Sequence, residues 1–65
     1  MFHINDVVEL VEDLPKEGLE KGLIGVVVAE FSDPVEAYEV EFCDESGVVM
    51  AQVSTTPDKI VKITN

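Results

Sequence analysis

The sequence predicts one small all-β domain that spans residues 1–65. Valine is the commonest residue, and β-branched side chains favour pleated sheets. The segment 38–42 alternates strictly between inward apolar and outward acidic residues, as in a strand with one buried face. Four glycines and three prolines divide the chain into short segments. We therefore expect five short strands joined by loops and turns.

A long loop follows the first strand. The segment 6–13 is predicted to be this strand, and Pro15 lies just beyond it, where it cannot donate to a central ladder. The segment 13–22 is therefore expected to be a loop of about ten residues, at the upper end of ordinary connections. Leu14 and Leu19 are expected to anchor the two ends of this loop on the core.

Four glycines are predicted to have structural roles. Gly18 and Gly22 fall in the folded-back loop, where a positive φ suits glycine. Gly25 stands at the sharp start of a buried strand over 23–31, where backbones pass closely. Gly47 is placed to take the left-handed conformation in the hairpin turn between the third and fourth strands.

The third strand follows a turn over 32–34 and is predicted at 37–42. Tyr38, Val40 and Phe42 share one parity and are expected to face inward, with the two intervening glutamates outward. The alternation is the cleanest in the chain, and it makes this strand the centre of the expected core.

Two further strands complete the expected fold. The fourth is predicted at 48–54, with the alternate residues from Val49 to Val53 on one face. A threonine, a proline and an acid over 56–58 have the pattern of a single helical turn with a capping threonine. The last strand is then expected at 60–63.

The order of these elements matches an SH3-like barrel. The expected fold is a small five-stranded barrel of this kind, with a long first loop and a 3₁₀ turn before the last strand. Closure would hide the strand edges that a flat sheet of this size exposes. Such a likeness of fold assigns no function by itself.

Several motifs together resemble a known family. They are DVVEL at 6–10, EDLP at 12–15, GL at 18–19, the glycine at 22, GVV at 25–27 and YEVEF at 38–42. This pattern resembles the bacterial domain-of-unknown-function family numbered forty-nine twenty-six over most of residues 6–63. The chain departs from it at Val26, where the family favours threonine, and at 30–35, which is longer and more acidic. The resemblance implies a small stand-alone acidic protein and brings no established activity.

The charge balance is strongly acidic. Fourteen Asp and Glu residues face four lysines, arginine is absent, and the formal net charge is −10. Such a chain repels phosphate backbones and anionic lipid surfaces. We therefore expect neither nucleic acid nor membrane as a partner.

No set of residues predicts a catalytic, cofactor-binding or metal-binding site. His3, the single histidine, lies in the N-terminal tail. Cys43 has acidic neighbours, which do not favour a nucleophilic thiolate. Asp33, Asp44 and Glu45 lack the alternating ligand spacing of a calcium loop. The chain is expected not to be an enzyme and to need no cofactor.

The expected location is the cytoplasm. The single cysteine excludes an internal disulfide, as is typical of a reducing compartment. The longest apolar run, 23–29, is far shorter than the roughly 20 residues that cross a bilayer. The first residues lack the basic and apolar regions of a targeting segment.

Two functional hypotheses follow. The first is a non-catalytic module that binds another protein, with an acidic face that either contacts the partner or only keeps the protein soluble. The residues of this face are Glu9, Glu12, Asp13, Glu39 and Glu41. The alternative is an acidic neutraliser or nucleic-acid mimic, of the antitoxin or immunity type, that binds a basic partner protein. Both hypotheses and the oligomeric state remain open at the level of sequence.

Overall fold

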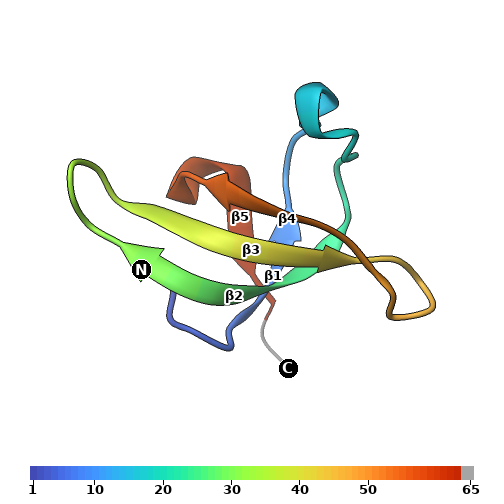
Figure 1. The fold of residues 1–65 in the computed structure, drawn as a ribbon, viewed down its shortest axis with the longest axis horizontal. Coiled ribbons are helices and arrows are strands. Elements are labelled where there is room, and N and C mark those ends of the chain that lie inside the picture. The colour runs from blue at the N-terminus through green and yellow to red at the C-terminus, as the bar shows by residue number, and fades with distance from the viewer. Residues whose placement is uncertain (64–65) are drawn as a thin grey trace.

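The computed structural model describes residues 1–63, and these residues form five strands in one antiparallel sheet (Figure 1). The strands are β1 (Val7–Leu10), β2 (Ile24–Phe31), β3 (Ala37–Cys43), β4 (Val49–Thr55) and β5 (Ile60–Lys62). Two 3₁₀ helices, η1 (Pro15–Glu17) and η2 (Pro57–Lys59), are the only helical elements of the described residues. The all-β class, the five strands and the 3₁₀ turn before the last strand are thus confirmed.

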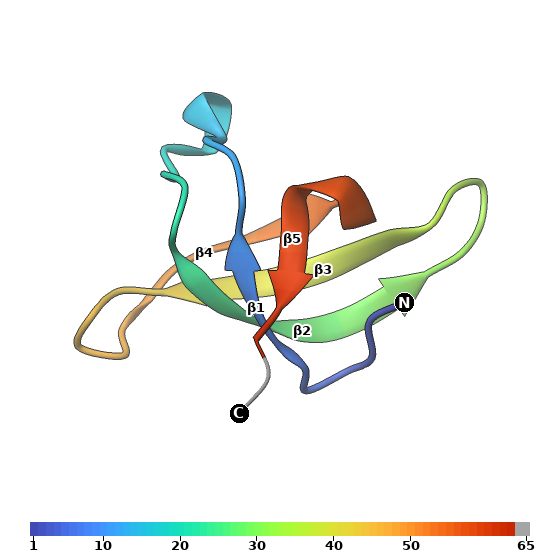
Figure 2. The same cartoon turned by 180° about the vertical axis from the view of Figure 1, so that it is seen from behind.

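The sheet is open and strongly bent. Its order is β4–β3–β2–β1–β5, so β4 and β5 are its two edges within residues 1–63. In Figure 1, β1 and β5 lie behind β3 and β4, and Figure 2, seen from the opposite side, shows them in front, with β2 leading from one layer to the other. Because β5 has three residues and pairs with β1 alone, no ladder joins it to β4. The expected closure into a barrel is therefore not confirmed.

The core lies between these two layers. Tyr38, Val40 and Phe42 on β3 are fully or almost fully buried, so the predicted parity of this strand is confirmed. The remaining core side chains come from every other strand and from the long loop: Val8, Leu10, Leu19, Val27, Val53 and Ile60. Alternation therefore predicted which side of β3 faces the core, and the bend of the sheet brings the other strands onto that side.

A bulge changes the face that Val49 presents. Phe42 pairs with Ala51 and Cys43 with Val49, so Met50 is an additional residue on β4. An additional residue interrupts the two-residue alternation, and Val49 consequently has half of its surface exposed. The expectation that Val49 shares a face with Val53 is wrong for this reason.

Gly25 lies where β2 packs tightly against β3. It pairs with Phe42 on β3 and with Val8 on β1. A Cβ atom here would lie 2.7 Å from Val40 Cγ1 and 2.8 Å from both Glu41 O and Phe42 Cδ1. Only glycine leaves room for this approach. The other three glycines all have positive φ: Gly18 (72°), Gly22 (99°) and Gly47 (82°).

The turn before β5 is held differently from the expectation. Pro57 is at the start of η2, as the pattern predicts, but Thr56 makes no side-chain hydrogen bond to the backbone. The Thr56 hydroxyl instead donates to the Asp58 carboxylate. This hydrogen bond, together with the Asp58 backbone N–H, lowers the pKa of the Asp58 carboxyl from its ordinary value. Thr56 therefore does not cap the helical turn through a backbone N–H, as expected, but contacts the Asp58 side chain.

Candidate functional site

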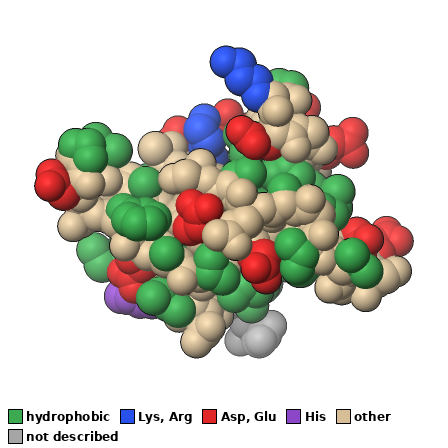
Figure 3. Space-filling model, viewed as in Figure 1, with side chains coloured by type: hydrophobic (Ala, Val, Ile, Leu, Met, Phe, Trp, Pro, Cys, Tyr) green, Lys and Arg blue, Asp and Glu red, His purple; other side chains and the backbone are tan. Residues whose placement is uncertain are grey.

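The five acidic residues predicted to form one face come from two strands and from the long loop. Glu39 and Glu41 are on the outward side of β3, and Glu9 is on the outward side of β1, with β2 between them. Figure 3 shows acidic side chains dispersed among hydrophobic and polar ones on the face that it views. Glu12 and Asp13 are outside the sheet, at the start of the long loop.

Glu12 and Asp13 help to hold that loop. Glu12 Oε2 accepts a hydrogen bond from Lys59 Nζ over 3.2 Å, which ties the loop to η2. Asp13 Oδ1 accepts from the Lys21 backbone N–H over 2.8 Å, which ties the two arms of the loop together. These two carboxylates therefore have structural contacts that the sequence did not predict.

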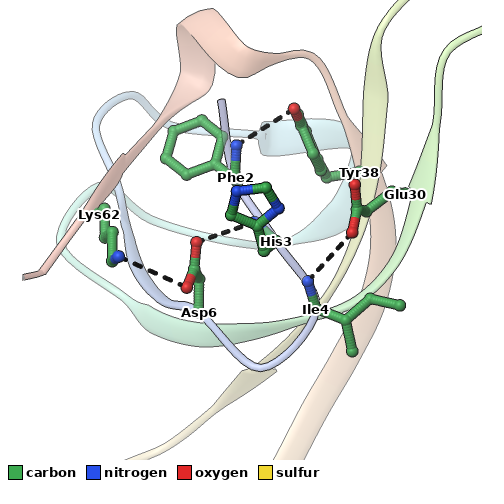
Figure 4. A network of polar contacts seen from close by, with 7 residues as sticks. All are labelled: Phe2, His3, Ile4, Asp6, Glu30, Tyr38 and Lys62. Atoms are coloured by element: carbon green, nitrogen blue, oxygen red, sulfur yellow. Dashed lines mark hydrogen bonds and ion pairs between the residues drawn. The ribbon is translucent and has the colours of Figure 1, made fainter.

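The N-terminal residues pack onto the sheet (Figure 4). The Phe2 ring meets the Tyr38 ring edge to face, with 5.2 Å between the centroids. The Phe2 backbone N–H donates to Tyr38 Oη over 3.2 Å, and Tyr38 Oη donates to a Glu36 carboxylate oxygen. This acceptor raises the pKa of the Tyr38 hydroxyl from its ordinary value. An aromatic residue at position 2 was the only signal of this packing in the sequence.

Asp6 anchors the same segment. Its carboxylate accepts from the His3 backbone N–H over 2.8 Å and lies 3.6 Å from Lys62 Nζ (Figure 4). The hydrogen bond from His3, and then the charge of Lys62, hold the pKa of the Asp6 carboxyl below its ordinary value. The Asn5 N–H also donates to Val27 O over 2.8 Å. His3 thus takes part through its backbone, and no contact of its imidazole defines a site.

Cys43 is a half-buried free thiol at the end of β3. Among residues 1–63, no three His, Cys, Asp or Glu side chains come together in a way that could hold a metal ion. Of the potentially reactive residues singled out from the sequence, Cys43, Asp44 and Glu45 line one surface hollow, but they do not form a group that could hold a metal ion.

A groove lies between the long loop and the β3–β4 hairpin. It consists of two adjoining hollows, of ≈ 410 and ≈ 320 Å³, which share Glu20 and Leu23. Its apolar lining comes from Pro15, Leu19, Leu23 and Ile24 on one side and Met50 on the other. Figures 1 and 3 show the raised loop at the top and the hairpin on the right, with hydrophobic side chains exposed between them.

The loop wall of the groove is held by backbone hydrogen bonds. Leu14 and Leu19 bond to each other in both directions, with N···O distances of 2.9 and 3.1 Å. The Leu10 N–H donates to Leu23 O over 2.9 Å, and the Gly22 N–H donates to Leu10 O over 2.8 Å. Leu19 is 2% exposed, so the loop is anchored on the core as expected.

The other wall of the groove, the β3–β4 hairpin, is held by hydrogen bonds in its turn. Asp44 Oδ1 accepts from the Ser46 and Val48 backbone N–H groups over 2.9 and 3.0 Å. The Gly47 N–H donates to Asp44 O over 2.9 Å, which closes the turn. The bulge that follows leaves Met50 48% exposed beside the groove. Both walls are therefore in place before any ligand binds, which lowers the entropic cost of binding.

Exposed carboxylates surround this apolar surface. They belong to Asp13 and Glu20 on the loop and to Asp44 and Glu45 on the hairpin. Lys21 is the one cation that lines either hollow. The sequence predicted none of this arrangement as a site, because Leu19 and Met50 are brought together only by the fold.

Together these features define a small all-β domain with a preformed, acid-rimmed apolar groove. Residues 4–62 match the model of the family described as Domain of unknown function (DUF4926), and the chain therefore belongs to that family. The resemblance of its motifs to this family is thus confirmed. A search of curated proteins found no match, and a search of solved structures found none either.

The described residues contain no helix with the length and apolar character needed to span a bilayer.

Proposed function

We propose that the chain is a non-catalytic module that binds another protein through the groove between the long loop and the β3–β4 hairpin. The observation that carries this proposal is the preformed apolar lining, to which Leu19, Leu23 and Met50 contribute. The larger hollow, at ≈ 410 Å³, is within the range of about 300–1,000 Å³ that is usual for binding clefts.

The shape of the surface favours a protein over a small molecule. The two hollows share Glu20 and Leu23 and both are open to solvent, so the surface is an open one rather than a single enclosed cavity. Val48 and Val49, which precede Met50 in the chain, are at least half exposed and add apolar surface on the same hairpin. Contiguous exposed apolar surface with a polar rim is typical of protein interaction sites.

The alternative, an acidic neutraliser of a basic protein, is favoured by a different observation. Glu39 and Glu41 lie on the same outward side of β3 and do not line the groove, in a chain of net charge −10. Binding by dispersed charge would be fast and strongly dependent on salt. The same charge argues against nucleic acid and anionic membranes as partners.

A cytoplasmic location remains part of the proposal. It is supported by the half-buried free thiol of Cys43, a state that a reducing compartment maintains.

Affinity purification from the source cells at low and high salt tests these functions. Three baits are compared: the wild-type chain, Met50→Lys in the groove and Glu39→Lys on the outward side of β3. A protein retained at high salt by the wild type and by Glu39→Lys, but lost with Met50→Lys, supports binding through the groove. A basic protein that salt releases, that Met50→Lys still retains and that Glu39→Lys recovers less well supports the neutraliser instead. Equal recovery with all three baits contradicts both.

A further inference from the structure

We propose that the groove recognises an extended basic segment of the partner, in which an apolar side chain is flanked by lysine or arginine. This inference rests on the proposed function and specifies the chemistry of the partner. It depends on three observations. The first is the apolar surface formed by Leu19, Leu23 and Met50, here called the seat. The others are the charges around this seat and the hydrogen bonds that hold the two walls in place.

The apolar side chain is expected to lie against Leu19, Leu23 and Met50. Leu19 is almost completely buried, so it forms the base of the hollow, while Met50 is 48% exposed and loses solvent contact when the hollow is filled. Methionine has a flexible, polarisable side chain that adapts to the shape of a ligand. The seat therefore selects for an apolar group without demanding one particular residue.

The flanking residues of the ligand are expected to be cationic. The first hollow has Asp13 and Glu20 on its rim, and the second has Glu20, Asp44 and Glu45. Four carboxylates and one ammonium group, that of Lys21, leave a net charge of −3 around the groove. An acidic or neutral segment gains nothing from these charges, and a second copy of a chain of net charge −10 is repelled.

An extended ligand fits the arrangement of the walls. The carboxylates are distributed along the loop and the hairpin, on both sides of Leu23, which the two hollows share. In an extended chain successive side chains point in opposite directions, so alternate residues meet the groove. One apolar residue between two cationic neighbours thus brings the central side chain to the seat, while the long, flexible side chains of its neighbours bend back toward the carboxylates of the rim.

The probe is a capped pentapeptide of alternating lysine and leucine, titrated at low salt into the full ¹⁵N-labelled chain. Two matched peptides, one with glutamate in place of lysine and one with serine in place of leucine, serve as controls. We expect amide shifts in segments 18–24 and 44–50 with the lysine–leucine peptide. The Kd of each control peptide is expected to be higher by about 3–10-fold, because the glutamate peptide loses the ion pairs with the rim and the serine peptide loses the apolar contact with the seat.

Three variants locate the interaction. Glu20→Lys is expected to raise the Kd of the lysine–leucine peptide about 3–10-fold at low salt and to weaken its salt dependence. Met50→Lys should raise it similarly. Glu39→Lys makes the same charge change outside the groove and should have a smaller effect. Glu20, Met50 and Glu39 are not core residues, and circular dichroism verifies that each variant is folded.

Three results overturn the inference: equal binding of the glutamate–leucine peptide, shifts centred on β3 instead of the groove, or a Glu20→Lys Kd equal to that of Glu39→Lys. If the lysine–leucine peptide does not shift the groove but Met50→Lys still abolishes capture of a partner, the basic segment is wrong and the proposed function stands. If the peptide does not bind and no captured protein depends on Met50, both are wrong.

Discussion

Gly25→Ala tests whether β2 and β3 pack too closely at this position to accommodate a Cβ atom. The added Cβ would lie 2.7–2.8 Å from Val40 Cγ1, Glu41 O and Phe42 Cδ1. These separations are about 1 Å inside the 3.5–4.0 Å optimum for carbon atoms. Val40 and Phe42 are fully buried, and the Glu41 oxygen belongs to the backbone of the paired strand. None of the three can move away without disturbing packing or pairing.

Two effects of opposite sign decide the magnitude. Overpacking a core usually costs about 1–3 kcal/mol, and three simultaneous contacts place this site in the upper half of that range. Replacing a strand glycine by alanine otherwise stabilises by about 0.5–1 kcal/mol. We therefore expect a net loss of about 2 kcal/mol in the free energy of unfolding. For a domain of this size that loss corresponds to a fall in Tm of about 8–16 °C.

Urea unfolding followed by circular dichroism measures this change, with Ala29→Gly on the same strand as the control. Ala29 is not fully buried, so removing its Cβ reports the ordinary preference of β2 for alanine over glycine. Both variants are expected to destabilise, although one adds a Cβ and the other removes it. If Gly25→Ala leaves the free energy of unfolding unchanged or raises it, the crowding argument is refuted.

Four further substitutions test the core, a buried hydroxyl that has no partner among the described residues, and the dependence of stability on pH. Val40→Asp buries an unpaired carboxylate and should abolish cooperative thermal unfolding. Glu41→Lys, on the outward side of β3, should unfold close to the wild-type Tm. Equal destabilisation by the two substitutions contradicts the assigned inward and outward sides of β3. Thr55 is 3% exposed, and its Oγ1 has no hydrogen-bond partner among the described residues. Thr55→Val should therefore raise the free energy of unfolding, measured by urea titration, by about 1 kcal/mol. A lower free energy of unfolding would indicate that this hydroxyl makes a hydrogen bond. The lowered pKa of Asp6 means that its stabilisation is present above the ordinary aspartate pKa and is lost as pH falls through the lower folded-state pKa. Tm should therefore decrease below about pH 4, and Asp6→Asn should flatten that decrease; an identical acid slope in the variant contradicts the assignment.

Local patterns in the sequence predicted much of the fold. The alternation over 38–42 was sufficient to orient β3, because side chains in a strand alternate irrespective of what surrounds them. Pro15 and the glycines marked the long loop, since their effects on φ and on hydrogen bonding act within one or two residues. The anchoring of the loop by Leu14 and Leu19 also followed from apolar residues in an otherwise polar segment.

The details that the sequence did not predict depend on how the strands pair. The bulge at Met50 arises from the register between β3 and β4, and it exposes Val49 against the simple alternation. Strand ends also shifted: β1 ends at Leu10, because the next N–H, that of Val11, donates to Lys59 O instead of to a neighbouring strand. The register of a strand and the residue at which it ends thus depend on hydrogen-bond partners that are distant in sequence.

The sequence by itself therefore determined the class of fold, the orientation of β3, the long loop and the acidic charge, all of which follow from local backbone preferences or from composition. Only the tertiary structure decided that the sheet stays open, that Phe2 packs on Tyr38 and that Leu19 and Met50 line one groove. The physical reason is that a groove or an aromatic contact joins residues that are far apart in the sequence. The number of residues between them does not indicate how close they lie in space. That distance is set by the bend and register of the sheet.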